Sequence, residues 1–186
     1  IAIENARLFR ETTESLERQT ATAEILKVIA SSPDDVQPVF DAIAGNAKRL
    51  LGGFSTMVAR IVDDSLHLVA LTPTTPEGDA ALRASFPWRV DEFGVGDRIR
   101  NGEMVQIADA WSQDDLPEMM RAVARRRGWR SAVFCPLQRD GGAIGMISVT
   151  RSEPGRFSPH EVQLLQTFAD QAVIANQNVR LFDGTR

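Results

Sequence analysis

The two ends of the chain carry the same nine-residue pattern. Residues 1–9 read IAIENARLF and residues 174–182 read IANQNVRLF, so Ile, Ala, Asn, Arg, Leu and Phe recur in register. Such a repeat predicts one period of a repeating architecture, and a period this long holds a whole domain with its connector. We therefore expect residues 1–9 to be the tail of a preceding repeat. A domain with a copy of the same helix at each end is more typical of a relay or receiver of signals than of a free-standing enzyme.

Composition limits the classes of protein to which the chain can belong. Its 186 residues suffice for one domain and a connecting helix. The net charge of -4 offers no basic face for nucleic acid, and no run of about 18 apolar residues predicts a membrane span. The single cysteine, Cys135, excludes an internal disulfide and suits a reducing compartment, so we expect a cytoplasmic protein. The lack of an initiator methionine and of a signal peptide suggests an excised fragment.

The first thirty residues contain neither Gly nor Pro and are predicted to form one helix about 45 Å long. Residues spaced three and four positions apart form a coiled-coil-like seam that includes several polar residues. The seam contains Ile1, Asn5, Leu8, Thr12, Leu16, Gln19, Ala23, Leu26 and Ala30. Because a polar helix of this length needs a partner, we expect residues 1–30 to be a connector that pairs with the same helix of a second subunit. The domain with its exit helix is expected over 31–186, and its folded part over about 36–182.

The rest of the chain alternates between helical and strand patterns. A helix is expected from the Ser-Ser-Pro-Asp-Asp stop at 31–35 to about Leu51. The predicted strands are 57–62, 66–71, 104–108, 130–137 and 143–151, and shorter helices are expected near 79–85, near 97–101 and over 116–127, where Gly128 ends the helix. This order predicts an α+β fold with an antiparallel sheet of five to six strands and helices packed on it.

The last helix has the clearest start signal in the chain. Ser158 stands at the cap, Pro159 at the first helical position and Glu161 three residues after the serine. The apolar face of this helix is expected to contain Val162, Leu165, Phe168, Ala169, Ala172, Val173 and Val179.

Several of these patterns are typical of one family. Residues 142–182 combine the end of the Asp-Gly hairpin, an IGMI strand, the Phe-Ser cap and the helix LQTFADQAVIA, and the upstream runs GEMVQIAD and SAVFCPL at 102–109 and 131–137 complete the set. In them residues 36–182 resemble a GAF domain, with Met104 where proline is usual. The flanking helices resemble those that join tandem GAF domains in bacterial sensor histidine kinases and cyclases. The resemblance implies a GAF fold with long terminal signalling helices, adjacent GAF domains and a kinase or cyclase output domain. It leaves the cofactor unassigned, because GAF domains bind cyclic nucleotides, haem, bilins, amino acids, small metabolites or nothing.

The residues that could carry catalysis or hold a metal are few. Cys135 lacks the neighbouring histidine of a bilin anchor and the further cysteines of a redox enzyme, so we interpret it as a buried structural thiol. His160 and Glu161 lack the sequence that follows a phospho-acceptor histidine, and His67 stands alone in a strand. The sequence therefore predicts neither catalysis nor a metal site.

A basic cluster and a group of large aromatic residues remain as candidates for ligand binding. The cluster comprises Arg121, Arg125, Arg126, Arg127 and Arg130, and it is either a solvated helix end or a clamp for a phosphate or carboxylate. Tryptophans beside arginines in a loop-rich segment are typical of small-molecule pockets. If a ligand exists, we expect it to contact Arg98, Trp111, Met119, Trp129 and Ser131.

These observations favour a regulatory sensor or relay domain of a signal-transduction protein. Pocket occupancy would shift the two terminal helices, which would act in a homodimer. The alternative is a ligand-free dimerisation and spacer module whose pocket is filled by its own side chains. A redox enzyme of the same fold is a third possibility, which the single cysteine disfavours.

Overall fold

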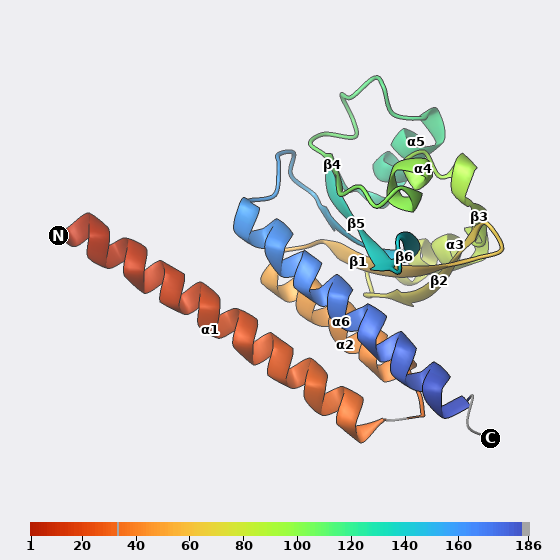
Figure 1. The fold of residues 1–186 in the computed structure, drawn as a ribbon. Coiled ribbons are helices and arrows are strands. Elements are labelled where there is room, and N and C mark those ends of the chain that lie inside the picture. Colours follow the sequence, from red (N-terminus) through yellow and green to blue (C-terminus); the bar gives the residue numbers. More distant parts are fainter. Residues whose placement is uncertain (33, 184–186) are drawn as a thin grey trace.

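The computed structural model describes the backbone of residues 1–32 and 34–183 and the side chains of 1–32 and 34–177. A sheet separates two helical layers (Figure 1). One face carries α1 (Ala2–Ser31), α2 (Gln37–Leu50) and α6 (Pro159–Asp183), and the other carries α3 (Pro76–Ser85), α4 (Gly96–Arg100), α5 (Glu118–Arg127) and a 3-10 turn at Val90–Glu92. The predicted α+β class is confirmed. We call the second layer, residues 73–129, the roof.

The sheet has six strands, all paired antiparallel in the order β3-β2-β1-β6-β5-β4. They are β1 (Ser55–Val62), β2 (Ser65–Leu71), β3 (Trp88–Arg89), β4 (Val105–Ile107), β5 (Ser131–Arg139) and β6 (Gly142–Arg151). The predicted strands at 57–62 and 66–71, and those at 130–137 and 143–151, pair as two hairpins. In the second hairpin the turn places Asp140 and Gly141 at φ 46° and 83°, as Asp-Gly turn chemistry requires. The two-residue strand β3 was not predicted.

Helices α2 and α6 pack directly on the sheet. Phe40 and Ile43 of α2 and Leu165 and Phe168 of α6 are fully buried in the core beneath the strands. The capping box of α6 forms as predicted: Ser158 Oγ accepts from the Glu161 amide at 3.2 Å, and the Ser158 amide donates to the Glu161 carboxylate at 2.8 Å. Of the predicted apolar face, only the side chain of Val179 lies outside the described residues.

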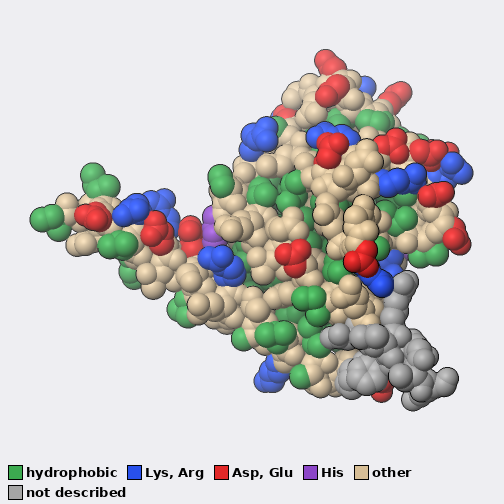
Figure 2. Space-filling model, viewed as in Figure 1, with side chains coloured by type: hydrophobic (Ala, Val, Ile, Leu, Met, Phe, Trp, Pro, Cys, Tyr) green, Lys and Arg blue, Asp and Glu red, His purple; other side chains and the backbone are tan. Residues whose placement is uncertain are grey.

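Helix α1 lies against α2 and α6, runs in the same direction as α6, and extends beyond it at its N-terminal end (Figure 1). Its inner face buries Ala21 and Ile25 completely. The predicted seam is a different face, because Leu16 and Leu26 are 61% and 55% exposed. Glu14 approaches His160 at the start of α6, so the first thirteen residues project past that helix. Apolar side chains remain exposed along this projecting end (Figure 2).

A second hydrophobic core lies between the roof and the face of the sheet that points away from α2 and α6. It includes Ile99 of α4, Ile107 of β4 and Trp129 after α5, packed with Phe134 and Met146 of the sheet. Gly128 ends α5 in the left-handed conformation at φ 85°, as predicted. None of the described helices is long and apolar enough to span a membrane.

Candidate ligand-binding site

A cavity of about 90 Å³ lies between the sheet and the roof. Strand alternation builds its floor, because every second side chain of a strand faces the same side. Ser55 and Met57 of β1 and Ser148 and Thr150 of β6 face the cavity, and Phe134 of β5 completes the floor. The intervening residues Val58, Val133, Ile147 and Val149 face α2 and α6 instead. The sheet is therefore the shared wall between the cavity and the helical layer.

Aromatic rings form one side of the cavity. Phe93 lies edge-to-face against Trp88, with ring centroids 6.3 Å apart and planes at 73°. It makes the same contact with Phe134 at 6.1 Å and 81°. Both arrangements are those that aromatic quadrupoles favour. Roof side chains cover this group of rings, and those that line the cavity are Leu82, Phe86, Pro117, Met119, Met120, Val123 and Trp129.

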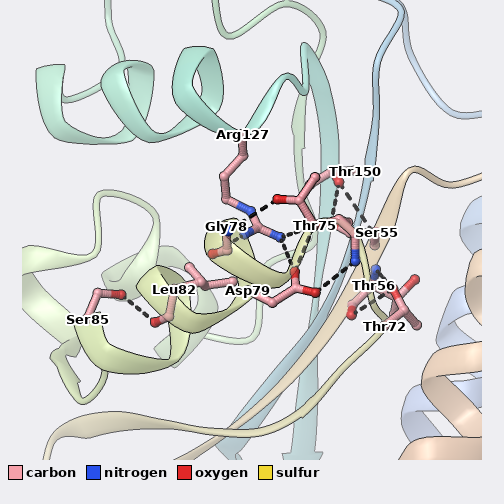
Figure 3. A network of polar contacts seen from close by, with 11 residues as sticks. Ser55, Thr56, Thr72, Thr75, Gly78, Asp79, Leu82, Ser85, Arg127 and Thr150 are labelled. Carbon is pink, nitrogen blue, oxygen red and sulfur yellow. Dashed lines mark hydrogen bonds and ion pairs between the residues drawn. The ribbon is translucent and has the colours of Figure 1, made fainter.

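A buried ion pair joins the roof helices α3 and α5 beside the cavity (Figure 3). Arg127, at the end of α5, reaches the start of α3, donates to Gly78 O at 2.8 Å and to Thr74 Oγ1 at 3.3 Å, and approaches Asp79 Oδ1 at 3.4 Å. The side chains of Arg127 and Asp79 are only 8% and 17% exposed. Asp79 also accepts from the amide and the hydroxyl of Thr74 at 2.9 and 2.6 Å.

Ionisation of Asp79 is favoured in this network. Burial alone would raise the pKa of the carboxyl, but the hydrogen bonds from Thr74 and the guanidinium of Arg127 outweigh it and hold the pKa below 3.8. The charge of Arg127 is therefore balanced within the protein, although the residue lines the cavity.

Three hydroxyl groups give the floor its polar character. Ser55 Oγ and Thr150 Oγ1 lie 2.8 Å apart and satisfy each other. Ser148 stands between Met57 and Phe134 in the register of β1, β6 and β5, and it is 3% exposed. Its side chain lines the cavity.

The structure places two of the five predicted ligand-binding residues at this cavity. Met119 and Trp129 line it, the first at the exposed rim and the second almost fully buried. Arg98 lies on α4 and pairs with Glu103 at 2.9 Å, outside the cavity. Ser131 lies on the helix-facing side of β5, as Val133 and Cys135 do, and donates to Glu153 O at 2.8 Å in a separate polar cleft.

The fifth predicted residue, Trp111, belongs to a different cluster. Its ring packs against the guanidinium groups of Arg125 and Arg130, 5.5 and 4.9 Å from the ring centroid. Arg130 also forms a two-pronged pair with Asp109 at 3.1 and 2.5 Å. This hydrogen-bonded pair, with further donors from Trp111 and Ser112, lowers the pKa of Asp109 to about 2 despite partial burial.

The basic cluster is thus largely engaged within the protein. Arg127 pairs with Asp79, Arg130 with Asp109, and Arg121 with Asp114 at 3.6 Å, while Arg125 donates to the carbonyl of Trp111 at 2.8 Å. Arg127 and Arg130 therefore pair within the protein, whereas Arg125 and Arg126 are exposed at the end of α5, as expected of a solvated helix end.

The cysteine and the histidines lie away from the cavity. Cys135 is fully buried among the helix-facing residues of the sheet, and burial, with a contribution from Asp170, raises the pKa of its thiol to about 12. A thiol in that state is a poor nucleophile. His67 is exposed on β2, and His160 faces Glu14 of α1. Within the described part of the chain no three His, Cys, Asp or Glu residues gather in a geometry that could hold a metal ion.

The sequence did not identify the hydroxyl floor or the role of Phe134. A signal was present: in the run Ile147-Ser148-Val149-Thr150 small polar residues alternate with apolar ones, although both faces of a central strand are covered. Buried polar positions in such a strand indicate a lined cavity rather than solvent.

Comparison with known proteins identifies the family of this fold. The GAF domain family model matches residues 35–176. No protein of curated function matches the chain.

Solved structures with the same fold come from several signalling proteins. A GAF domain/HD domain protein from Geobacter sulfurreducens is 16% identical, with a TM-score of 0.71, over 81% of this chain and 97% of that one. A domain of a putative two-component sensor histidine kinase from Sinorhizobium meliloti is 17% identical, with a TM-score of 0.64, over 78% and 93%. A GAF domain from Synechocystis, solved in a photoproduct state, is 20% identical, with a TM-score of 0.69, over 82% and 99%. At these identities the likeness shows the fold alone.

Proposed function

The chain belongs to the GAF family, and we propose that it senses a small molecule in the cavity between sheet and roof and passes the signal to the terminal helices. GAF domains are sensory and regulatory signalling domains that often bind small molecules or chromophores. The observation that carries the proposal is the cavity itself, enclosed by apolar and aromatic side chains with a few polar groups, as ligand sites usually are.

The strand β6 supports the proposed route of the signal. Ser148 and Thr150 border the cavity, while Ile147 and Val149 of the same strand pack in the core with α2 and α6. A ligand that moves the floor must therefore change the packing beneath these helices. Because close-packed cores respond by switching between discrete arrangements, such a change shifts a helix rather than fading locally.

The exposed face of α1 supports a homodimer as the form that relays the signal. Ile1 and Phe9 are 100% and 76% exposed, and Leu16 and Leu26 continue the apolar face along the helix. Burial of these side chains against the same face of a second copy would remove them from water. In this proposal the full-length protein is a cytoplasmic histidine kinase or cyclase with adjacent GAF domains, and the paired helices act on its output domain.

A cavity-filling substitution distinguishes the proposed sensor domain from the alternative, a ligand-free spacer module. Val123→Phe places extra volume in the cavity from α5, and Val62→Phe makes the same change at an exposed position of β1. A sensor predicts altered hydrogen exchange in α1, α2 and α6 for Val123→Phe only. Unchanged exchange in those helices, together with no small molecule retained in native mass spectra of the purified chain, would establish the spacer instead.

The dimer has its own test. Replacement of Leu16 and Leu26 by Glu is expected to convert a dimer to a monomer in light-scattering chromatography, because four buried leucines per dimer would become charged. Glu17→Arg changes the charge at an exposed position of α1 that faces away from Leu16 and Leu26, and it is expected to leave the dimer intact. A dimer that survives both leucine substitutions would rule out pairing through this face.

A further inference from the structure

The side chains that line the cavity favour an aromatic ligand over an alkyl chain. Aromatic side chains approach it from several elements: Phe86 and Trp88 before the 3-10 turn, Phe93 after it, Trp129 after α5 and Phe134 on β5. The thioethers of Met57, Met119 and Met120 complete the lining. An aromatic ligand would gain binding free energy from edge-to-face and sulfur–ring contacts in addition to the burial of its apolar surface. An alkyl chain would gain binding free energy from the burial of apolar surface alone.

The size of the cavity limits the ligand to a small molecule. Pockets for drug-sized ligands enclose roughly 300–1,000 Å³. The free volume here is about 90 Å³, against roughly 150 Å³ for a protein cavity that holds benzene, so this cavity suits one ring once the rim at Met119 yields. The same comparison disfavours a tetrapyrrole, and Cys135 lies on the other face of the sheet, where it cannot anchor one.

The charges at the cavity favour an uncharged ligand. Two charged side chains border it, Arg127 and Glu92. Arg127 is neutralised by Asp79 in a pair that is almost fully buried, so an anionic ligand would have to displace that carboxylate. Glu92 is 64% exposed and faces Arg89 at 3.8 Å, which leaves it in solvent at the rim. A charged ligand would therefore lose its hydration without gaining a buried counter-ion.

The third hydroxyl of the floor belongs to Ser148. Ser55 and Thr150 bond to each other, whereas Ser148 lines the cavity between Met57 and Phe134 in the register of the sheet and is only 3% exposed. A ligand that carries one hydroxyl, amino or carbonyl group on its ring can pair with it. Such a pair would keep both polar groups hydrogen-bonded after the ligand has excluded water from the cavity.

We propose that the ligand class is an uncharged aromatic molecule of one ring that bears a single hydrogen-bonding group directed at Ser148. Phenol is the simplest member of this class. The inference rests on the proposed sensory function and names the chemistry of that same site.

Calorimetric titration of the whole chain with four probes tests this class. Phenol has the ring and the hydroxyl, toluene has only the ring, cyclohexanol has only the hydroxyl, and benzoate replaces the hydroxyl by a charge. Phenol is expected to bind most tightly, and the affinities of benzoate and cyclohexanol are expected to be at least tenfold lower. Ser148→Ala is expected to lower the affinity for phenol by about threefold to tenfold, because one net hydrogen bond is lost, and to leave the affinity for toluene unchanged.

Matched controls separate the outcomes. Ser152→Ala removes a serine from the exposed loop after β6 and is expected to change none of the four affinities. Benzoate binding more tightly than phenol, or phenol affinity unaffected by Ser148→Ala, would overturn the proposed class. If none of the probes binds but Val123→Phe still alters exchange in α1 and α6, the aromatic class is wrong and the sensory function stands. If Val123→Phe also has no effect, both proposals fail.

Discussion

The Arg127–Asp79 pair is expected to hold the roof closed, and its contribution can be worked out from the contacts. Helix α3 has no buried residue of its own, so its attachment to α5 depends on the three interactions of Arg127 with Thr74, Gly78 and Asp79. Removal of one partner of a buried ion pair usually costs about 3–5 kcal/mol. The 3.4 Å separation and the partial exposure of Asp79 place this pair at the lower end.

We therefore expect Arg127→Met to lower the free energy of unfolding by about 3 kcal/mol. Asp79→Asn retains the shape and part of the Thr74 hydrogen bonding, so a loss of about 2 kcal/mol is expected. In the double variant neither charge is left unpaired, and the coupling between the two positions should be about 1–2 kcal/mol. Arg126→Met alters an exposed neighbour and should change stability by less than about 0.5 kcal/mol.

Urea unfolding followed by circular dichroism measures these four free energies. Hydrogen exchange of the α3 amides provides a local readout, which should accelerate in Arg127→Met before the helical layer is affected. If the two single losses add within about 0.5 kcal/mol, the residues do not interact and the argument for a fastened roof is refuted.

Three further perturbations follow from the structure. The pKa of Asp109 is lowered from 3.8 to about 2, so the ionised carboxylate stabilises the folded state fully above pH 3.8, and this contribution is lost as the pH falls toward 2. Asp109→Asn should therefore flatten the dependence of the urea midpoint on pH in that interval. Gly128→Ala places a side chain at φ 85° and should lower stability by about 1 kcal/mol in the same assay, with Gly142→Ala, which meets no neighbouring atom and has no positive φ, as its control. Phe168→Ala removes a fully buried ring from the helical core and should cost about 3–5 kcal/mol in urea unfolding; a loss below 1 kcal/mol would mean that α6 does not pack as described.

Local sequence signals predicted most of the elements correctly. The capping box at Ser158 and the Asp140-Gly141 turn act through a few neighbouring residues, so their outcome can be foreseen without tertiary contacts. Strand β3 could not be foreseen, because its two residues are extended only through pairing with β2. The inner face of α1 was also hidden: Ala21 and Ile25 are buried by α2 and α6, and a helix with two apolar faces does not reveal which one its own domain covers.

The site was harder to predict than the fold. Arginines and tryptophans near in sequence suggested one ligand pocket, yet Trp111 stacks on Arg125 and Arg130 while Trp129 lines the cavity. Which arginine meets which carboxylate depends on loop paths, as Arg127 and Asp79 illustrate across 48 positions of sequence. Periodicity contains no information about such pairings.

The alternation of β6 has a consequence for how this domain can change over evolution. Ser148 and Thr150 border the cavity, and Ile147 and Val149 pack in the core with the helices, so even and odd positions of one strand face different layers. Under the proposed function, substitutions at the even positions would alter ligand preference without repacking the helical core. Substitutions at the odd positions would adjust how strongly the helices respond without altering the ligand. The proposal thus predicts that ligand preference and helix response can change independently, although consecutive residues of the strand are only about 3.4 Å apart.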